Sequence, residues 1–265
     1  MRDSFDREIR YLRISVTDRC NLRCVYCMPE EGVPWMDHAR VISFEDIRDT
    51  VAAAVSLGFD KFRLTGGEPL VRKGILDLVS MLRAVPGVGT LAMTTNGTRL
   101  APLAAALKAS GLDSVNVSLD TLDPARYAAV TRRGDLADAV AGIEAAAAAG
   151  LKVKLNVVVM EAYGERDLAE IRAWAAARGL AVQSIARYDL ASDKLDEHAY
   201  DRPPPCATCD RIRLLADGTL RPCLRSSLGV SLDRKDPAAS IRQCIHIKPA
   251  AGATCDDLSI AQIGG

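Results

Sequence analysis

Short runs rich in β-branched residues alternate with longer runs rich in alanine and leucine between residues 11 and 187, and this alternation limits the possible fold most. The runs predict strands at 11–17, 61–65, 90–95, 114–119, 152–160 and 181–187. They predict helices between those strands at 44–57, 74–84, 101–110, 136–149 and 166–178. Such alternation is typical of a parallel sheet with helices outside. Six units are too few for a closed eight-stranded barrel, so we predict an α/β fold built on a partial (βα)6 barrel.

The pattern changes after residue 187, so we divide the chain into a barrel domain at 1–187 and a smaller domain at 188–265. A polar stretch leads from the barrel to three prolines at 203–205, which form a stiff connector. Short strands are predicted at 211–215 and 219–221, on either side of a turn at Asp217-Gly218. We therefore expect a small C-terminal β module behind the barrel.

Three cysteines, Cys20, Cys24 and Cys27, follow the first predicted strand within a span of eight residues. Thiolates at this spacing can converge on one soft metal centre. They are one fewer than a closed iron–sulfur cluster needs, so a [4Fe–4S] cluster here would keep one iron free to bind a small molecule. The alternatives are a zinc knuckle or three incidental buried cysteines, but no further Cys or His follows before His38. We favour the cluster.

A second set of three cysteines, Cys206, Cys209 and Cys223, lies in the C-terminal module. In a chain with eight cysteines and no secretion signal, metal or redox chemistry explains them better than disulfides do. A second cluster and a structural zinc site are both open. For zinc, the chain offers three candidate fourth ligands: Cys244, Cys255 and His246.

Polar residues recur where the predicted strands end, which is where parallel α/β folds collect their chemistry. The second strand ends in the loop Gly66–Pro69, the third in Thr94-Thr95-Asn96-Gly97 and the fourth in Ser118-Leu119-Asp120. Each of these is also ordinary turn chemistry when taken alone. Their recurrence on one rim of the barrel favours a site.

The first cysteine set, in the sequence TDRCNLRCVYCMP, resembles the motif of radical S-adenosylmethionine (SAM) enzymes. In that family the open iron chelates the methionine part of SAM, and one electron from the cluster releases a 5′-deoxyadenosyl radical. The stretch from Cys206 to Leu224 and the final Gln262-Ile263-Gly264-Gly265 resemble the GTP 3′,8-cyclase family of molybdenum cofactor biosynthesis. The resemblance covers nearly the whole chain. It implies a partial, TIM-like barrel with the SAM cluster at one mouth and a second three-cysteine [4Fe–4S] cluster across the cavity.

The resemblance also implies a role for individual residues, carried over by motif. The first cluster would be held by Cys20, Cys24 and Cys27, and the second by Cys206, Cys209 and Cys223. The residues that would bind SAM are Tyr26, Gly66, Gly67, Glu68 and Ser118. Those that would contact GTP are Arg13, Arg63, Thr94, Lys154, Arg211 and Arg213. A catalytic part is implied for Arg13, Arg211, Arg213 and the tail glycines Gly264 and Gly265.

Physical chemistry supports the cationic part of this set. A triphosphate carries several negative charges, and arginine supplies paired donors for them. Arg13, Arg63 and Lys154 lie on predicted core strands, where cations are rare without a ligand or partner. Arg211 and Arg213 alternate along a short strand that we expect to be exposed, so a solvated face is an alternative for these two.

We therefore predict a lyase of the radical SAM type that converts GTP to 3′,8-cyclo-7,8-dihydro-GTP. The segment before Cys206 and the stretch after Leu224 are shorter than in the family, Asp210 stands where the family commonly has Asn, and the SAM-contacting Met of the sixth strand has no counterpart at Arg187-Tyr188. These departures leave open a radical SAM enzyme that acts on a peptide or another small metabolite. A non-catalytic iron–sulfur or zinc protein is a third alternative. The Gly66–Pro69 loop argues against it, because an electron carrier needs no SAM site.

Charge and hydropathy limit the kinds of partner and the cellular location that we expect for this protein. The 34 basic and 34 acidic residues balance, so nothing points to a nucleic-acid or membrane surface. The chain has no apolar stretch of about 18 residues, and its N-terminus is charged rather than signal-like. We predict a cytoplasmic enzyme that uses a small-molecule substrate and an electron donor. The sequence leaves a homodimer open.

Overall fold

The computed structural model describes residues 1–160, 164–187, 190, 200–201, 205–255 and 260–263. The terminal Gly264-Gly265 and most of the predicted connector at 188–205 lie outside these residues. No helix in the described part is both long and apolar enough to span a lipid bilayer.

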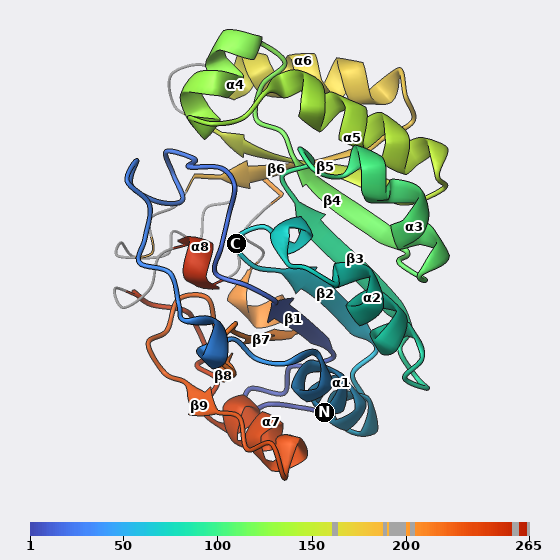
Figure 1. The fold of residues 1–265 in the computed structure, drawn as a ribbon. Coiled ribbons are helices and arrows are strands. Elements are labelled where there is room, and N and C mark those ends of the chain that lie inside the picture. The colour runs from blue at the N-terminus through green and yellow to red at the C-terminus, as the bar shows by residue number, and fades with distance from the viewer. Residues whose placement is uncertain (161–163, 188–189, 191–199, 202–204, 256–259, 264–265) are drawn as a thin grey trace.

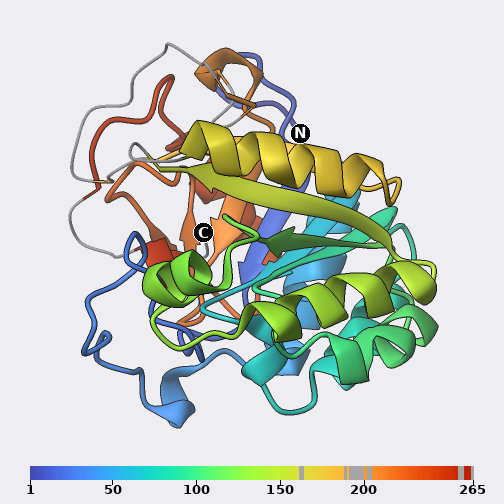
Figure 2. The ribbon, with the colours of Figure 1, turned by 90° about the horizontal axis from the view of Figure 1, so that it is seen from above.

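A curved parallel sheet with helices outside it forms the body of the molecule (Figure 1 and Figure 2). Six of its strands neighbour one another in chain order: β1 (Tyr11–Ser15), β2 (Lys61–Thr65), β3 (Thr90–Thr95), β4 (Ser114–Ser118), β5 (Lys152–Val159) and β6 (Ala181–Ala186). Every predicted strand is present, with its ends within two residues of the prediction. The alternation of patterns therefore gave the correct fold class, a partial (βα)6 barrel.

The outer layer consists of helices that follow the strands along the chain: α1 (Phe44–Ser56), α2 (Ile75–Arg83), α3 (Ala104–Ala109), α4 (Pro124–Thr131), α5 (Leu136–Ala148) and α6 (Gly164–Ala176). Short 3-10 turns precede α1, α2 and α3 and begin the C-terminal part: η1 (His38–Arg40), η2 (Pro69–Val71), η3 (Ala101–Leu103) and η4 (Cys206–Thr208). Ser43 caps α1 by accepting a hydrogen bond from the Asp46 N–H, as its sequence position predicts. The buried faces of these helices pack on the outer face of the sheet and form one continuous core.

The sequence prediction missed the four-residue α8 (Ile260–Ile263) and two longer helices, α4 and α7 (Pro237–His246). Both begin with an Asp-Pro pair. Asp123 accepts a hydrogen bond from the Arg126 N–H at 2.8 Å, and Asp236 accepts one from the Ala239 N–H at 2.9 Å. A capping aspartate followed by proline at the first helical position is a start signal that the sequence already carried.

The C-terminal strands extend the main sheet, beyond the edge formed by β1. They are β7 (Arg211–Leu214), β8 (Thr219–Arg221) and β9 (Val230–Ser231). β7 runs parallel to β1, whereas β8 and β9 continue the sheet antiparallel; a short helix, α8 (Ile260–Ile263), follows later. Ile212 and Leu214 join the same core as the barrel strands. The expectation of an exposed strand was wrong for Arg213, which is only 5% exposed because its strand lies within the sheet.

Candidate functional site

One cavity of about 460 Å³ opens inside the curve of the sheet and brings together residues from nearly every strand. All the site residues predicted from the sequence line it, except the terminal glycines, which lie outside the described residues: Arg13, Cys20, Cys24, Tyr26, Cys27, Arg63, Gly66, Gly67, Glu68, Thr94, Ser118, Lys154, Cys206, Cys209, Arg211, Arg213 and Cys223. The structure thus gathers these residues in one place. Their individual roles stay predictions.

The first cysteine set lies in the loop after β1, and its three thiols are half-buried and free of disulfides. The Leu22 N–H donates to Cys20 Sγ at 3.4 Å. Burial raises the pKa of the Cys20 thiol to about 11. Hydrogen bonding to Cys24, together with burial, raises the pKa of the Cys27 thiol. Such crowded thiols become thiolates when a cationic centre binds them, so the donor set fits an iron–sulfur cluster.

The loop after β2 packs directly on the loop that leads into these cysteines. The Gly67 N–H donates to the Thr17 carbonyl and the Glu68 N–H to the Arg19 carbonyl, both at 2.8 Å. A Cβ atom on Gly67 would lie 2.3 Å from the Arg19 carbonyl oxygen. Only glycine permits this approach, so Gly67 holds the two loops together beside the cysteines.

Glu68 is a buried carboxylate beneath the first cysteine set. It accepts hydrogen bonds from the Thr95 hydroxyl and the Asn96 N–H at 2.7 Å, and from the Leu70 N–H at 3.0 Å. Burial raises its pKa to about 7, although these donors oppose the shift. A carboxylate offers about four acceptor sites, so Glu68 can accept one more donor from the cavity.

Tyr26, next to Cys27, is fixed by a carboxylate that the sequence analysis did not select. Its hydroxyl donates to Asp120 Oδ2 at 2.7 Å, and the Val158 N–H donates to Asp120 Oδ1 at 2.8 Å. Burial raises the pKa of Asp120 to about 6 and that of Tyr26 above its usual value. Asp120 therefore ties the cysteine loop to the ends of β4 and β5.

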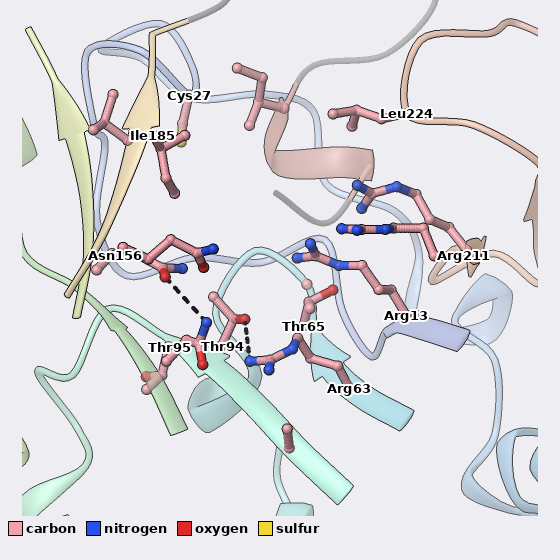
Figure 3. A pocket seen from close by; sticks show the side chains of 18 of the residues that line it. Arg13, Cys27, Arg63, Thr65, Thr94, Thr95, Asn156, Ile185, Arg211 and Leu224 are labelled. Atoms are coloured by element: carbon pink, nitrogen blue, oxygen red, sulfur yellow. Dashed lines mark hydrogen bonds between the residues drawn. The ribbon is translucent and has the colours of Figure 1, made fainter. Parts of the chain in front are cut away.

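Three arginines form a row across the adjacent strands β2, β1 and β7, because Arg13 is in register with Arg63 on one side and with Arg213 on the other. Burial, together with the neighbouring charges of Arg213 and Arg63, lowers the pKa of Arg13 to about 9. Figure 3 shows Arg13, Arg63 and Arg211 pointing into the pocket from one side, with Cys27 across from them. Like charges gathered this closely suit a polyanionic ligand.

Tyr11 and Thr94 orient one of these arginines. Arg63 donates from Nε to the Tyr11 hydroxyl at 2.6 Å and from Nη1 to Thr94 Oγ1 at 3.3 Å. Burial would raise the pKa of Tyr11, but Arg63, Arg13 and Arg211 lower it below its usual value. Arg63 therefore contacts the phenol group of Tyr11 and also lines the open cavity.

The second cysteine set lines the same cavity next to Arg211, and its thiols are half-buried and free of disulfides. Burial would raise the pKa of Cys209, but Lys248 and Arg211 lower it below its usual value. The Arg225 N–H donates to Cys223 Sγ at 3.4 Å. Three cysteines with such donors and charges beside them fit a bound cluster.

The candidate fourth zinc ligands lie elsewhere. Cys244 is in the main hydrophobic core, where burial raises its pKa to about 12. Cys255 packs in a separate apolar cluster with Leu190 and Leu215, and His246 is exposed. None of the three is among the described residues that line the cavity. The second set therefore resembles the first, with three cysteines facing a shared space.

The sequence analysis also missed residues on the strands that it had placed correctly. Asn116 and Asn156 line the cavity, and the Asn116 amide donates to Asn156 Oδ1 at 3.2 Å. They lie two residues from Ser118 and Lys154 respectively, and side chains two apart on a strand share a face. The twofold period was the signal that would have found them.

Comparison with known proteins identifies the family. The radical SAM superfamily matches residues 14–175. The GTP 3′,8-cyclase of Pelotomaculum thermopropionicum is 39% identical over an alignment of 329 residues that covers 100% of both chains. That of Heliobacterium modesticaldum is 41% identical over 280 residues, covering 88% of this chain and 86% of the relative.

Among solved structures, Streptococcus suis SuiB bound to S-adenosylmethionine matches with a TM-score of 0.67 at 13% identity, over 92% of this chain and 65% of SuiB. Native anSMEcpe with bound AdoMet matches with a TM-score of 0.65 at 15% identity, over 85% of this chain and 78% of that one. These structures share the fold, whereas the relatives above share the sequence. The chain therefore belongs to the radical SAM superfamily and, within it, to the family of the GTP 3′,8-cyclases.

Proposed function

We propose that this cavity converts GTP to 3′,8-cyclo-7,8-dihydro-GTP, a precursor in molybdenum cofactor biosynthesis. The observation that carries the proposal is the row Arg63–Arg13–Arg213, which faces the same cavity as two sets of three cysteines. As a member of its family, the protein uses SAM and [4Fe–4S] clusters. The first cysteine set would hold the SAM cluster, and the second set would hold the cluster at the substrate.

The cluster and SAM would be held at the first set and would supply the radical chemistry needed to join the ribose to C8 of guanine. The protein's own residues orient the reactants. Glu68 has one acceptor site left for the ammonium group of SAM. Tyr26 would lie against SAM because Asp120 fixes its hydroxyl, and Ser118 lines the same cavity.

The cations would bind the triphosphate. Arg63 is already aimed by its hydrogen bonds to Tyr11 and Thr94, so it loses little freedom when it binds a phosphate. Arg13 and Arg213 would continue the row beside Arg63, and Lys154 and Arg211 would complete the anion site. Binding a polyanion would relieve the mutual repulsion of these charges, which makes the site selective for highly charged substrates.

The same row favours a nucleoside triphosphate over the alternative of a peptide substrate. One of the solved structures with this fold is SuiB bound to its precursor peptide SuiA. A peptide backbone presents dipoles, and it would not offset three adjacent arginine charges in a partly desolvated cavity. A nucleoside triphosphate does so directly.

The decisive experiment is anaerobic incubation of the reconstituted protein with SAM, a reductant and GTP. The cyclised product is an isomer of GTP, because the ribose loses one hydrogen atom and the purine gains an electron and a proton. We expect a new species with the mass of GTP but a different chromatographic position, and one equivalent of 5′-deoxyadenosine for each. Formation of 5′-deoxyadenosine with no loss of GTP would contradict the proposal. The electron donor and the cytoplasmic location stay predictions, and the oligomeric state stays open.

A further inference from the structure

Lys248 is a buried lysine whose ammonium group reaches the second cysteine set. Only 3% of the surface of Lys248 is exposed to solvent. Nζ lies 3.4 Å from Cys209 Sγ, and it donates to the Arg211 carbonyl at 2.9 Å and to the Pro222 carbonyl at 2.6 Å. An ammonium group has three donors, so all three are used here. Lys248 therefore joins the strand that follows Cys209 to the turn that precedes Cys223.

The surrounding chain holds this lysine in position from both sides. Lys248 follows α7, whose buried residues Ile241 and Ile245 belong to the main core. On its other side, Arg7 donates to the carbonyls of Pro249 and Ala250 at 2.6 and 2.8 Å. Lys248 is thus carried on a segment that cannot shift without breaking buried contacts.

Arg7 connects the same segment to the remaining cysteine. Its Nη1 also donates to the Cys206 carbonyl at 2.9 Å, and its Nε is paired with Asp3 Oδ2 at 2.7 Å. Both members of this ion pair are buried, so the hydrogen bonds of Arg7 are shielded from water. All three cysteines of the second set are therefore connected, through their own atoms or through adjacent carbonyls, to Lys248 and Arg7.

The three partners of the Lys248 ammonium group are one cysteine sulfur and two carbonyl oxygens. Among the described residues no carboxylate forms an ion pair with Lys248, and two of its three acceptors are neutral carbonyl groups. A buried ammonium group is costly without a counter-charge. A thiolate at Cys209 supplies that charge, and cluster binding keeps it a thiolate. The lysine and a cluster at this site would therefore stabilise each other.

We propose that Lys248 is a positioning residue of the second cluster, which holds Cys209 and the Pro222 turn in place and raises the reduction potential of the cluster. The inference rests on the proposed function only in that it needs a cluster at this site. Hydrogen bonds and positive charge at a cluster sulfur ligand stabilise the reduced, more negative form. Neither the relatives' names nor the fold assigns this role to the lysine.

The test compares the holoenzyme with its Lys248→Met variant in an anaerobic redox titration followed by electron paramagnetic resonance. SAM alters the signal of the cluster to which it binds, so the signal that SAM leaves unchanged reports the second cluster. We expect its potential in K248M to fall by about 59 mV, which is a tenfold change for a one-electron couple. Lys248→Arg keeps the positive charge, so the potential of the second cluster should fall by less in this variant. Lys235→Met, an exposed lysine just before α7, is the matched control and should not change the potential.

Each outcome decides the inference. Selective loss of the second cluster in K248M, with SAM cleavage intact, would also support it, because the lysine would then be needed to hold the cluster. An unchanged potential and iron content in K248M would overturn it. If K248M does not fold, Lys248→Gln removes the charge with less loss of hydrogen bonding and is judged by the same two readouts. Wild-type protein with zinc, or with no cluster, at the second set would instead overturn the two-cluster assignment, and the inference with it.

Discussion

At the level of one residue, Arg13 lowers the stability of the folded protein but is placed to bind the substrate. Its neighbours in register, Arg63 and Arg213, are also cations, and burial removes water from its guanidinium group. The pKa of Arg13 is lowered to about 9, so its charged form is disfavoured in the folded protein. Near pH 7 the group is still charged, and the fold bears that cost at all pH values below about 9.

Replacing Arg13 with Met should therefore stabilise the ligand-free protein while weakening GTP binding. A lost charged hydrogen bond is worth about 1.5–3 kcal/mol, so GTP affinity should fall by about tenfold to a hundredfold. Thermal denaturation and equilibrium dialysis with GTP measure the two effects. Arg172→Met, on the exposed face of α6, is the control and should leave GTP affinity unchanged. A destabilised R13M variant with normal GTP affinity would show that Arg13 is a structural residue.

Glu68 gives the site a pH dependence. Its pKa is raised to about 7, so the fraction of carboxylate grows from about one-tenth at pH 6 to about nine-tenths at pH 8. The SAM ammonium group needs the carboxylate, so SAM affinity should rise almost tenfold over this range and level off above it. Binding titrations across this range measure the effect. Glu68→Gln should bind SAM weakly with a flat profile, whereas Glu144→Gln, exposed on α5, should keep the rise. A rise that persists in E68Q would assign the pH dependence to another group.

The same raised pKa has an opposite consequence for stability. Between the ordinary pKa of 4.5 and the folded value of about 7, the folded protein binds more protons at Glu68 than the unfolded chain does. The contribution of Glu68 to the free energy of unfolding therefore decreases as the pH rises through this window. The carboxylate is kept in the fold at a cost to stability, which is typical of a functional site.

At the level of elements, the Asp-Pro starts of α4 and α7 show how local chemistry places remote parts of the site. The cap at Asp236 begins a helix that packs into the main core and ends just before Lys248. The helix therefore helps to fix the position of Lys248 beside the second cysteine set. Sequence reasoning overlooked it because the helix directly follows no predicted strand and lies outside the alternation of strands and helices.

Asp236→Ala should remove the cap of α7 and lower the free energy of unfolding by about 1 kcal/mol, because the Ala239 N–H loses its acceptor. Denaturant titration of the variant against wild type measures the difference. Lys235→Ala alters the adjacent exposed residue without touching the cap and should have little effect. Equal losses in both variants would mean that the cap itself contributes nothing.

At the level of the whole molecule, two cysteine sets that are far apart in the sequence face one cavity. Their separation predicts a division of labour. Cys24→Ala should abolish SAM cleavage, whereas Cys209→Ala should retain cleavage to 5′-deoxyadenosine without forming product. Iron analysis should give about eight irons per chain in wild type and about four in each variant, from four per cluster. A C209A variant that cannot cleave SAM, although its first cluster is intact by spectroscopy, would contradict the division.

By itself, the sequence determined all the strands except β9, most of the helices and the identity of both cysteine sets. These features are local: a twofold or 3.6-residue period shows within one segment, and cysteine spacing within one loop. The Gly66–Pro69 loop was likewise readable, because polar and glycine residues recur where the predicted strands end. Cysteine spacing and hydrophobic period do not depend on the segment against which a stretch packs, so both can be recognised in the sequence alone.

Only the tertiary structure decided which strand lies beside β1. The sequence suggested that 211–215 forms a separate exposed strand, but β7 pairs with β1 and completes the row Arg63–Arg13–Arg213. The contacts from Lys248 and Arg7 to the second cysteine set depend on the same long-range packing. Strand order is set by burying apolar faces from distant segments in one core, and a pattern within a single segment carries no record of the partner that it will bury.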